Sequence, residues 1–470
     1  MATTSRGTSA VVEESAEDAA YRKRVTRKIA WRVVPLLAFA YFMASLERAN
    51  LGIAALSMNK ALGLTQAAFG LAAGLFFVGY FFFEVPSNWA LSKYGARKWL
   101  GRIALTWGII ATLTAVVQGP ASLYIMRILL GIAEAGLFPG VAFFFTLWFP
   151  ARERAKMLSL FVAGGLLSGI FGPILSSAIL QWLPNGILGL EDWRALFIIE
   201  GLPSILVGVL IWLFLVDRPE KAQWLSDDEK TWLTNELAAE AVPQKKHINP
   251  FRSLVNPKIL LLSFVYFTKN CSGYVLVFFM PIIIKQLGSD NGGSFSPLTI
   301  GALTALPAAV SIFTAIAWAA HSDKAQERRW HSALPLLLAA LGIIAGAATS
   351  NPWLLMGALI VATVGVNSMS GAFFQIPTLF LSGSMVAVGL AAVNSVGNLG
   401  GFVGPYLFGI LQDSTGSFFV GSLLLAILLV FGAATVLLPI FRRKAAPDAA
   451  TLDATSDPVA ASRPPAVDEV

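Results

Sequence analysis

The sequence predicts an all-α membrane protein with twelve transmembrane helices, and three observations indicate that fold class. The hydrophobic fraction is 56% and only 13% of the residues are charged, against about 25% in an ordinary soluble protein. Apolar runs of about 20 residues, each long enough to cross a bilayer as a helix, recur from Trp31 to Phe441. Two patterns in the first half of the chain also recur in the second half, which indicates a duplicated architecture.

The apolar runs define the helices in chain order, because short clusters of Lys and Arg separate most of them. In the first half we expect helices at residues 31–56, 67–91, 99–117, 122–149, 155–182 and 194–216. In the second half we expect them at residues 258–286, 297–320, 331–350, 353–381, 385–411 and 418–441. The predicted domains are a disordered and basic cytoplasmic tail (1–30), a six-helix bundle (31–216), a cytoplasmic central loop (217–257), a second six-helix bundle (258–441) and a disordered cytoplasmic tail (442–470).

One helix start stands out within the central loop. Ser226 and Glu229 form a capping box, in which two side chains satisfy free amides at the first turn of a helix. Trp232, Leu233 and Leu237 then give a short apolar face. We expect an amphipathic helix that lies on the cytoplasmic surface.

The orientation follows from the rule that cytoplasmic connections carry an excess of Lys and Arg. Alternate connections hold little positive charge beyond Lys60, Arg194 and Lys285. The connection near 382–385 has no charge, so it neither supports nor contradicts the pattern. The remaining connections and both tails are basic, through residues 22–28, Lys93, Arg97, Lys98, Arg152, Arg154, Lys156, 218–252, Lys324, Arg328, Arg329 and 442–444. This parity predicts a multi-pass protein of the inner (plasma) membrane with both termini in the cytoplasm.

The repeated patterns lie at a nearly constant offset. GGLLSGIFGP covers 164–173 and VGNLGGFVGP covers 396–405, so that Gly165 and Gly397 stand 232 positions apart. The basic segment SKYGARK at 92–98 is echoed 231 positions later by DKAQERR at 323–329. Such repeats predict two pseudo-symmetric six-helix bundles with a shared cavity near the midplane.

Several function classes are excluded by what the sequence lacks. There is no Gly-Lys pair, so no phosphate-binding loop of the GxxxxGK[ST] type holds ATP. The single Cys271 excludes an internal disulfide and a CxxC site. The three histidines fall in polar connections, too far apart in sequence to suggest a cluster. The net charge of +7 is spread over many connections rather than one face, so we expect no nucleic acid, metal or cofactor.

Charged residues inside the spans are functional candidates, because each costs about 2.5–3.5 kcal/mol on insertion scales. Glu47 and Arg48 lie within SLERAN, and Arg127 and Glu134 within RILLGIAEAG. Lys269 lies in the other half; snorkelling to the interface is its alternative interpretation, and a structural ion pair is that of the other four. The three cations suit a carboxylate or phosphate, and the two glutamates suit proton coupling. An anion that reaches an arginine would weaken its hold on a glutamate and so favour proton uptake, which is the thermodynamic basis of symport.

Other polar residues in the spans form a weaker set of candidates. Interhelical hydrogen bonding is their alternative role. The set consists of Tyr80, Tyr274, Gln375, Asn394 and Asn398. We expect Glu84 and Arg102 to contact the basic loop and helix ends. Glu200, before Gly201-Leu202-Pro203, could be functional or structural, and we favour a structural role.

A family resemblance rests on several segments that together cover nearly all of residues 25–440. They are ERANLGIAAL, GLFFVGYFFFEVPSN, YGARKW, RILLGIAEAGLFPG, LWFP, FIIEGLP, SDKAQERRWHSALP and AVNSVGNLGGFVGPYLFG. The sequence resembles the anion:cation symporter branch of the major facilitator superfamily, and it looks most like the tartrate-transporter-type organic anion permeases. The resemblance implies two six-helix bundles that work by alternating access.

The resemblance also implies roles for individual residues. Arg48 would bind the anion, Glu47 and Glu134 would couple protons with Arg127 paired to Glu134, and Tyr80 and Asn394 would line the substrate site. The branch usually has Asp at the position of Glu47. Phosphate-ester exchangers of the branch have Arg where Gly273 stands, so a carboxylate is favoured over an organophosphate. Phe374-Gln375 stands where many relatives have Trp and a small residue. This difference leaves open which substrate the corresponding wall of the site prefers.

These observations predict a secondary transporter that imports a small organic anion, such as a tartrate-like dicarboxylate or sugar acid, by proton symport. An aromatic acid of the phthalate or hydroxyphenylacetate type is the main alternative substrate. An anion exchanger and a transporter-like nutrient sensor are further alternatives, and no nucleophile, base and metal constellation indicates an enzyme. The expected partners are the anion, protons and the lipid bilayer, and we expect a monomer.

Overall fold

The computed structural model describes residues 15–184, 189–240, 256–290, 292–381 and 384–441, and it is all-helical over these ranges. The first bundle contains α1 (Ala16–Ala61), α2 (Gln66–Tyr94), α3 (Ala96–Leu113), α4 (Pro120–Glu134), α5 (Leu137–Trp148), α6 (Ala151–Trp182) and α7 (Asp192–Phe214). The surface helix α8 (Asp227–Ala239) follows. The second bundle contains α10 (Pro257–Asp290), α11 (Pro297–Ala325), α12 (Arg329–Ala347), α13 (Pro352–Phe373), α14 (Ser384–Asn398), α15 (Gly400–Thr415) and α16 (Phe418–Val436). Short 3-10 turns occupy Thr114–Val116, Pro219–Lys221, Pro377–Leu379 and Pro439–Phe441.

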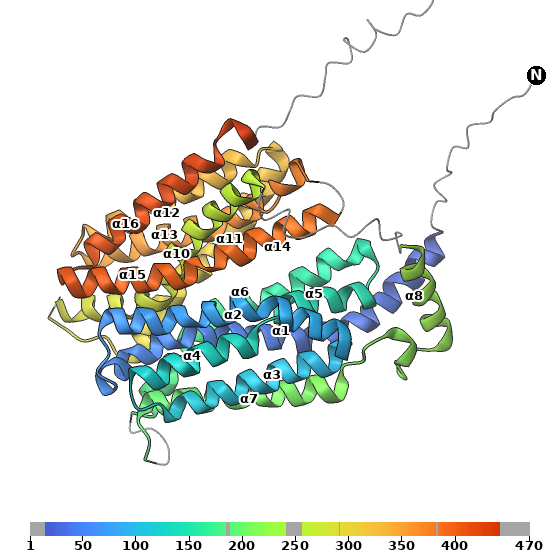
Figure 1. Ribbon diagram of the computed structural model, residues 1–470, viewed down its shortest axis with the longest axis horizontal. Helices are drawn as coiled ribbons and strands as arrows, with labels where there is room; N and C mark the ends of the chain where they lie inside the picture. The colour runs from blue at the N-terminus through green and yellow to red at the C-terminus, as the bar shows by residue number, and fades with distance from the viewer. Residues whose placement is uncertain (1–14, 185–188, 241–255, 291, 382–383, 442–470) are drawn as a thin grey trace, which may run out of the picture.

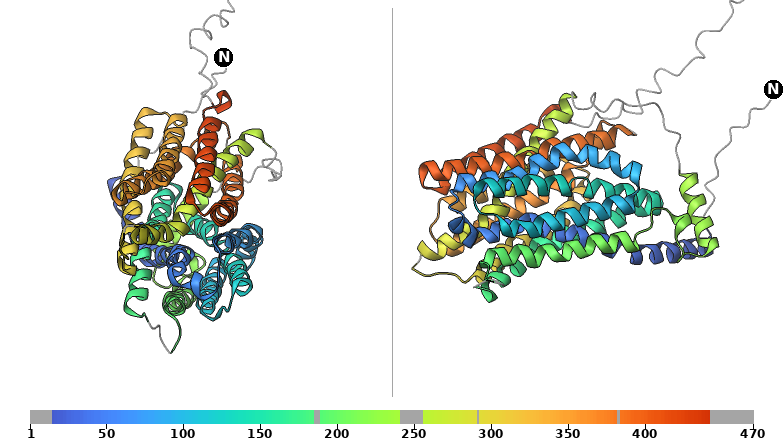
Figure 2. Two further views of the ribbon diagram at one scale, coloured as in Figure 1. Left: turned by 90° about the vertical axis from the view of Figure 1, so that its left-hand side faces the viewer. Right: turned by 60° about the horizontal axis from the view of Figure 1, so that its bottom comes forward.

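The helices form two bundles that lie side by side (Figure 1). Viewed along the bundles, the helices of the second half gather above those of the first half (Figure 2). Eleven described segments are long and apolar enough to cross a membrane. The consecutive helices α14 and α15 supply the remaining crossing, each being too short to span alone. The predicted twelve-helix fold in two bundles is therefore confirmed.

Two predicted spans are broken in the structure. The run expected at 122–149 divides into α4 and α5, because Gly136 adopts a left-handed conformation with φ 89°. The break frees the Ala135 carbonyl, which accepts a 2.6 Å hydrogen bond from Ser87 Oγ of α2. The run expected at 385–411 divides at Leu399 into α14 and α15. The first break lies beside α2, and α14, which ends at the second break, packs against α10 and α2.

Helix α1 begins much earlier than predicted, and this corrects part of the expected disordered tail. Residues 16–30 are helical because Ser15 caps the first turn, its side chain accepting a hydrogen bond from the Asp18 amide. An ion pair of 2.8 Å between Arg22 and Glu153 of α6 then holds the extension against the first bundle. The rest of the expected disordered tail, residues 1–14, lies outside the described residues, as do 241–255 of the central loop and the tail 442–470.

Helix α8 confirms the predicted capping box, with both cap hydrogen bonds between Ser226 and Glu229 present. It packs against the start of α1 and α6 (Figure 1). Its ion pairs with these helices are Lys28–Glu229 at 2.6 Å, Arg152–Glu236 at 2.6 Å and Arg154–Glu240 at 3.0 Å. Helix α8 is thus attached to the first bundle, and we call this end of the molecule the α8 end and the opposite one the far end.

The contacts between the bundles repeat with the internal duplication. They pair α1 with α10, α2 with α15 and α6 with α11. A Cβ atom at Gly70 of α2 would lie 2.1 Å from the Pro405 carbonyl oxygen of α15, and one at Gly301 of α11 would lie 2.4 Å from that of Pro173 of α6. The two glycines stand 231 positions apart and the two prolines 232 apart. The same close contact therefore occurs twice, related by the exchange of the two halves.

Polar contacts also join the bundles at the far end. Asp413 of α15 accepts hydrogen bonds from the amides of Gln66 and Ala67 at the start of α2, at 3.0 and 2.8 Å. Lys285 of α10 donates to the Leu56 carbonyl of α1 at 2.6 Å. These contacts and the close glycine packing hold the bundles together at the end away from α8.

Candidate functional site

The centre of the site is an ion pair between Arg48 of α1 and Glu134, the last residue of α4. Glu134 is 2% exposed, whereas the Arg48 side chain keeps 20% of its surface accessible. The Arg48 guanidinium also lies over the rings of Phe76 and Tyr80 of α2, at 4.9 and 5.9 Å from their centroids. Arg48 is therefore a cation that is neutralised on one side and reachable on the other.

Arg127 does not pair with Glu134, which corrects the pairing implied by the family resemblance. It donates instead to the Ala72 carbonyl at 3.3 Å, and its Nη2 atom has no hydrogen-bond partner among the described residues. Seven residues along one helix correspond to about 10 Å, whereas Arg48 faces Glu134 directly from α1. Arg127 packs against the Phe76 ring at 5.3 Å, so that two guanidinium groups flank one ring.

Glu47 is buried beside this site but contacts no arginine. Its Oε1 atom accepts a hydrogen bond from Ser204 of α7, and its Oε2 atom has no partner in the described structure. Glu200 of α7 lies next to this pair and accepts hydrogen bonds of 2.7 Å from Asn50 and from Ser176. Glu47 therefore belongs to a group of carboxyl and neutral polar side chains between α1, α6 and α7.

The second bundle presents Lys269 and Tyr274 of α10 toward the first. Lys269 Nζ donates to Asn270 Oδ1 at 3.3 Å and lies 5.3 Å from the centre of the Tyr266 ring. Tyr274 packs against Phe77 of α2, with ring planes tilted by 53° and ring centres 4.2 Å apart. In the described residues Lys269 forms no ion pair with a carboxylate, so its positive charge is free for a ligand.

The remaining predicted residues are divided between the site and its surroundings. Asn398 accepts a hydrogen bond from Asn270 at 3.2 Å and so braces the residue next to Lys269. Asn394 is half-buried on α14, and its side chain has no hydrogen bond to another described residue. Gln375 is exposed, because α13 ends at Phe373 rather than continuing to 381 as expected. Glu84, expected at the basic loop, instead accepts a 3.0 Å hydrogen bond from Ser395 of the second bundle.

A cavity of about 280 Å³ lies between the bundles beside Lys269 and Tyr274. Its other walls come from Gly165 and Gly169 of α6 and from Ser311 and Asn367. Asn367 of α13 donates to Ser311 of α11 at 2.8 Å, and neither residue stood out in the sequence, where single polar residues in apolar spans are common. The volume is close to the lower bound of about 300 Å³ for small-molecule sites, which favours a compact ligand.

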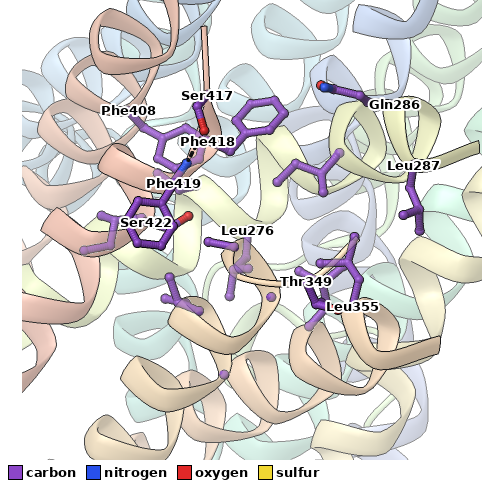
Figure 3. A pocket seen from close by; sticks show the side chains of 18 of the residues that line it. Leu276, Gln286, Leu287, Thr349, Leu355, Phe408, Ser417, Phe418, Phe419 and Ser422 are labelled. Atoms are coloured by element: carbon purple, nitrogen blue, oxygen red, sulfur yellow. Dashed lines mark hydrogen bonds between the residues drawn. The ribbon is translucent and has the colours of Figure 1, made fainter. Parts of the chain in front are cut away.

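A separate pocket of about 490 Å³ lies at the far end of the second bundle (Figure 3). Leu276, Leu355 and Phe418 form much of its wall, with Gln286 and Ser417 near its rim. It contains none of the charged residues of the centre of the bundles. Of these charged residues Lys269 lines the smaller cavity between the bundles, and Ala49, next to Arg48, lines it from α1. We therefore place the candidate site there.

Two histidines that are distant in sequence contact each other, contrary to expectation. His321 Nδ1 and His331 Nε2 lie 2.7 Å apart, and His331 Nδ1 lies 2.9 Å from Glu327 Oε2. Burial raises the pKa of Glu327, but hydrogen bonds from the Trp330 amide and the His331 ring outweigh it and leave that pKa below its usual range. No group of three His, Cys, Asp or Glu side chains in the described ranges could hold a metal ion. His247 lies outside the described residues.

The fold and the buried charges between two bundles define a membrane transporter. The sequence profile of the Major Facilitator Superfamily matches residues 37–405, and the chain belongs to this superfamily. A protein of Agrobacterium vitis named "Putative tartrate transporter" is 43% identical over 415 residues, covering 88% of this chain and 94% of that protein. A quinolone resistance transporter of Acinetobacter baumannii is 39% identical over 414 residues, again covering 88% and 94%.

Solved structures support the same fold. A bacterial homolog of the human lysosomal transporter Spinster, in an inward-facing and unoccupied conformation, matches with a TM-score of 0.71 and 19% identity, covering 87% of this chain and 96% of that one. The two sequence relatives are named for very different compounds at nearly equal identity. The choice of substrate therefore depends on the residues of the site.

Proposed function

We propose that the chain imports a small organic anion, of the tartrate-like dicarboxylate or sugar-acid type, together with protons by alternating access. The observation that carries this proposal is the arrangement of two cations in opposite bundles, Arg48 paired with Glu134 and Lys269 without a carboxylate partner. The similarity to the Agrobacterium vitis protein supports the substrate class.

Proton coupling follows from competition for Arg48. A substrate carboxylate that forms charge-assisted hydrogen bonds with Arg48 displaces Glu134 from its counter-ion. A buried carboxylate without a counter-ion is costly, so Glu134 then takes up a proton. Anion binding and proton binding thus favour each other, and by linkage each increases the affinity for the other.

A dicarboxylate also provides a reason for the bundles to move. One carboxylate can bind Arg48 of the first bundle while the other binds Lys269 of the second. Tyr274 of the second bundle packs against Phe77 of the first. Such a ligand links the two halves, whereas a monocarboxylate satisfies only one. The neutral walls formed by Ser311 and Asn367 suit the hydroxyl groups of a sugar acid.

We further propose that the protein lies in the inner (plasma) membrane and that its α8 end faces the cytoplasm. The connections at this end carry most of the Lys and Arg, including Arg97, Arg152 and Arg328, which matches the charge rule for cytoplasmic loops. Both termini would then be cytoplasmic. Both bundles of the chain contribute to the cavity wall, and we propose a monomer as the functional unit.

The test is uptake of labelled tartrate into proteoliposomes, driven by an inward pH gradient, with a panel of unlabelled acids as competitors. We expect accumulation that a protonophore abolishes and that dicarboxylates or sugar acids compete for best. Rapid exchange against preloaded tartrate without accumulation under the gradient would overturn symport and indicate an exchanger. Absence of both activities, with no competing acid protecting the protein thermally, would overturn the substrate class.

An aromatic acid is a second candidate substrate, favoured by the aromatic residues around the two cations. Phe76 and Tyr80 face Arg48, and Phe77 and Tyr274 pack against each other across the bundles. An aromatic ring can add stacking of about 0.5–1.5 kcal/mol to the contact with the arginine. Phthalate or hydroxyphenylacetate as the best competitor in the same assay would assign this class instead.

A further inference from the structure

A ladder of polar contacts joins α1 and α7 behind the Arg48–Glu134 pair. Ser204 of α7 donates to Glu47 of α1, and Asn50 of α1 donates to Glu200 of α7 at 2.7 Å. Glu47 and Asn50 are three residues apart and Glu200 and Ser204 are four apart, so each pair lies on one face of its helix. Ser176 of α6 completes the outer rung with a 2.7 Å hydrogen bond to Glu200.

Both carboxyl groups of the ladder are buried without a counter-ion. Glu200 is 4% exposed and Glu47 is 2% exposed, and no Lys, Arg or His in the described ranges forms an ion pair with either. Two buried carboxylates without a cation repel each other and lose hydration, so that ionising both is costly. The arrangement therefore favours at least one bound proton.

The serine partners allow that proton to come and go. A hydroxyl group can either donate to a carboxylate or accept from a carboxylic acid, so Ser176 and Ser204 can satisfy Glu200 and Glu47 in both forms. An arginine can only donate, and it therefore favours the ionised form, as Arg48 does for Glu134. The serine-bonded pair is built for reversible proton binding.

The polar face of α1 continues from the ladder toward the far end. Ser57 follows Asn50 by seven residues on the same side of the helix, about 10 Å along the axis. Glu47 Oε2, Asn50 Oδ1 and Ser57 Oγ are all buried atoms without a hydrogen-bond partner in the described structure. Ordered water is the usual partner of such atoms, so a water-mediated path along α1 would run past these three atoms.

This path reaches the surface at a hollow of about 330 Å³ at the far end. Ser57 lines it together with Glu191 and Asp192 at the start of α7. Glu191 forms an ion pair of 2.9 Å with Arg194, whereas Asp192 forms none among the described residues. The Asp192 carboxylate therefore lowers the electrostatic cost of bringing in a cation such as a proton. The hollow lies within the first bundle, beside the contacts that hold the bundles together.

We propose that Glu200 is a proton-binding residue that passes protons between the far-end hollow and Glu47. The proton moves from the Glu200 carboxylic acid, through water that bridges the two groups beside Asn50, to the Glu47 carboxylate, and Glu200 is recharged from the hollow. This inference rests on the proposed function, because it adds a third carboxyl group to the coupling of anion and proton. It departs from the structural role that the sequence suggested for Glu200.

The groups that face Glu200 determine what its pH dependence reports. Glu47 is the titratable group on α1; α6 contributes Ser176, and α3 contributes Thr112, which packs against Gly201. Glu191 and Asp192 precede it on α7, at the surface. A change in pH profile confined to a Glu200 variant is therefore attributable to Glu200 or to its coupling with Glu47.

The experiment compares Glu200→Gln with the wild type in proteoliposomes. We expect tartrate exchange without a pH gradient to stay within about twofold, because Glu200 does not touch the substrate cavity. Uptake driven by the gradient should fall at least tenfold, and its dependence on external pH should flatten. Glu200→Asp, which keeps a titratable carboxyl group, should restore part of the driven uptake and the pH dependence.

The matched control is Glu84→Gln, which removes another buried carboxyl group bonded to a serine, on α2 and outside the ladder. It should keep the wild-type pH profile. Glu200→Gln with wild-type driven uptake and pH profile would overturn the proposal. Loss of exchange as well, not recovered by Glu200→Asp, would also overturn it, because this outcome assigns Glu200 a structural role.

A measurement without substrate separates this proposal from the proposed function. Infrared spectroscopy detects the carbonyl stretch of protonated buried carboxyl groups, and we expect Glu200→Gln to remove one pH-dependent component of that band. Failure of the wild type to take up any organic anion would refute the proposed function and leave this measurement to decide on Glu200. An unchanged band would refute proton binding at Glu200 even where transport is intact.

Discussion

Arg48 has two competing functions at the residue scale, because it is the counter-ion of Glu134 and the accessible cation of the site. The two functions compete for the charge of one guanidinium group, since a ligand that forms charge-assisted hydrogen bonds with Arg48 weakens its pairing with Glu134. Glu47, one residue before Arg48, faces Ser204 of α7 instead. Adjacent residues on α1 thus serve two different polar networks, because successive side chains on a helix point about 100° apart.

Substitution Glu134→Gln separates anion binding from proton coupling. Without the competing carboxylate, Arg48 should bind tartrate more tightly in exchange assays, by several-fold to about tenfold, where tenfold is 1.4 kcal/mol. Accumulation under a pH gradient should be lost, because no carboxyl group at this position takes up the proton. The measurement is the apparent affinity in exchange and the protonophore-sensitive accumulation. Full accumulation by this variant would contradict the coupling scheme.

Substitution Lys269→Met tests which bundle selects dicarboxylates. Removing a charge-assisted hydrogen bond costs about 1.5–3 kcal/mol, so the apparent affinity for tartrate should fall by about ten- to one-hundredfold. The affinity for a monocarboxylate that uses Arg48 alone should change little. Lys269→Arg is the matched control and should keep the preference for dicarboxylates. Equal losses for both classes would show that Lys269 does not contact the second carboxylate.

Helix α8 is the clearest case at the element scale of a segment held by charge. Burial raises the pKa of Glu229, but hydrogen bonds from Lys28 and the Ser226 amide outweigh it, so the pKa lies below its usual range. Trp232 also packs edge-on against Tyr21 of α1, with ring centres 5.9 Å apart. These ion pairs and the ring contact are with α1 and α6, so α8 should move with the first bundle during transport.

Substitution Glu229→Gln should loosen α8 without affecting the bundles. It removes an ion pair worth about 0.2–1 kcal/mol and weakens the capping box, so amide hydrogen exchange in α8 should speed up by a few-fold to tenfold. Exchange in α3 should stay unchanged. Glu220→Gln, at an exposed acid of the same loop, is the control. Equal protection of α8 in wild type and variant would refute a docking role for Glu229.

The pH dependence of this docking follows from the lowered pKa. A carboxyl group whose folded-state pKa is depressed contributes stability above its ordinary value of about 4.3 and loses it as the pH falls through the lower value. Protection of α8, corrected for intrinsic exchange rates, should therefore be constant between about pH 5.5 and 7.5. It should decrease only below about pH 4. A decrease around neutral pH would assign the docking to another group.

At the scale of the whole molecule, the far end is closed by two symmetry-related contacts of glycine with proline carbonyl groups. Gly70 with Pro405 and Gly301 with Pro173 bring α2 to α15 and α6 to α11. Because these contacts are between bundles, a larger side chain can be accommodated by rotating the bundles apart. A close approach of the same kind within one bundle has no such freedom. A Cβ atom at Gly131, for example, would lie 2.0 Å from the Phe76 carbonyl oxygen.

Substitution Gly70→Leu should therefore shift the protein toward a state open at the far end. Spin labels at Lys60→Cys and Ser289→Cys, both at exposed far-end positions, should move apart by several ångströms, and the native Cys271 is buried and should not react. Gly357→Leu is the control, because a Cβ at Gly357 meets nothing within 4 Å. Gly131→Leu should instead impair folding. An unchanged distance in folded Gly70→Leu would show that this contact does not keep the far end closed.

The amino-acid sequence was enough to predict the fold class, the number of membrane-spanning segments and the duplication. The length of the apolar runs and the offset of the repeats can be read from the chain without a structure. The sequence also identified most of the ionisable residues, since a charge in an apolar run is visible without structure. It did not predict the break at Gly136 or the early start of α1. Both depend on partners from other segments, Ser87 and Glu153 respectively.

The ion pairs, by contrast, depend on how the helices pack in three dimensions. Arg127 and Glu134 share a helix, yet Glu134 pairs with Arg48, because residues from different helices can approach face to face while a rigid helix keeps its own residues apart. The same reason explains Glu200 and Asn50, which are 150 positions apart and form one hydrogen bond. Two buried glutamates look alike in the sequence. Their partners in the fold, an arginine for one and a serine for the other, distinguish them.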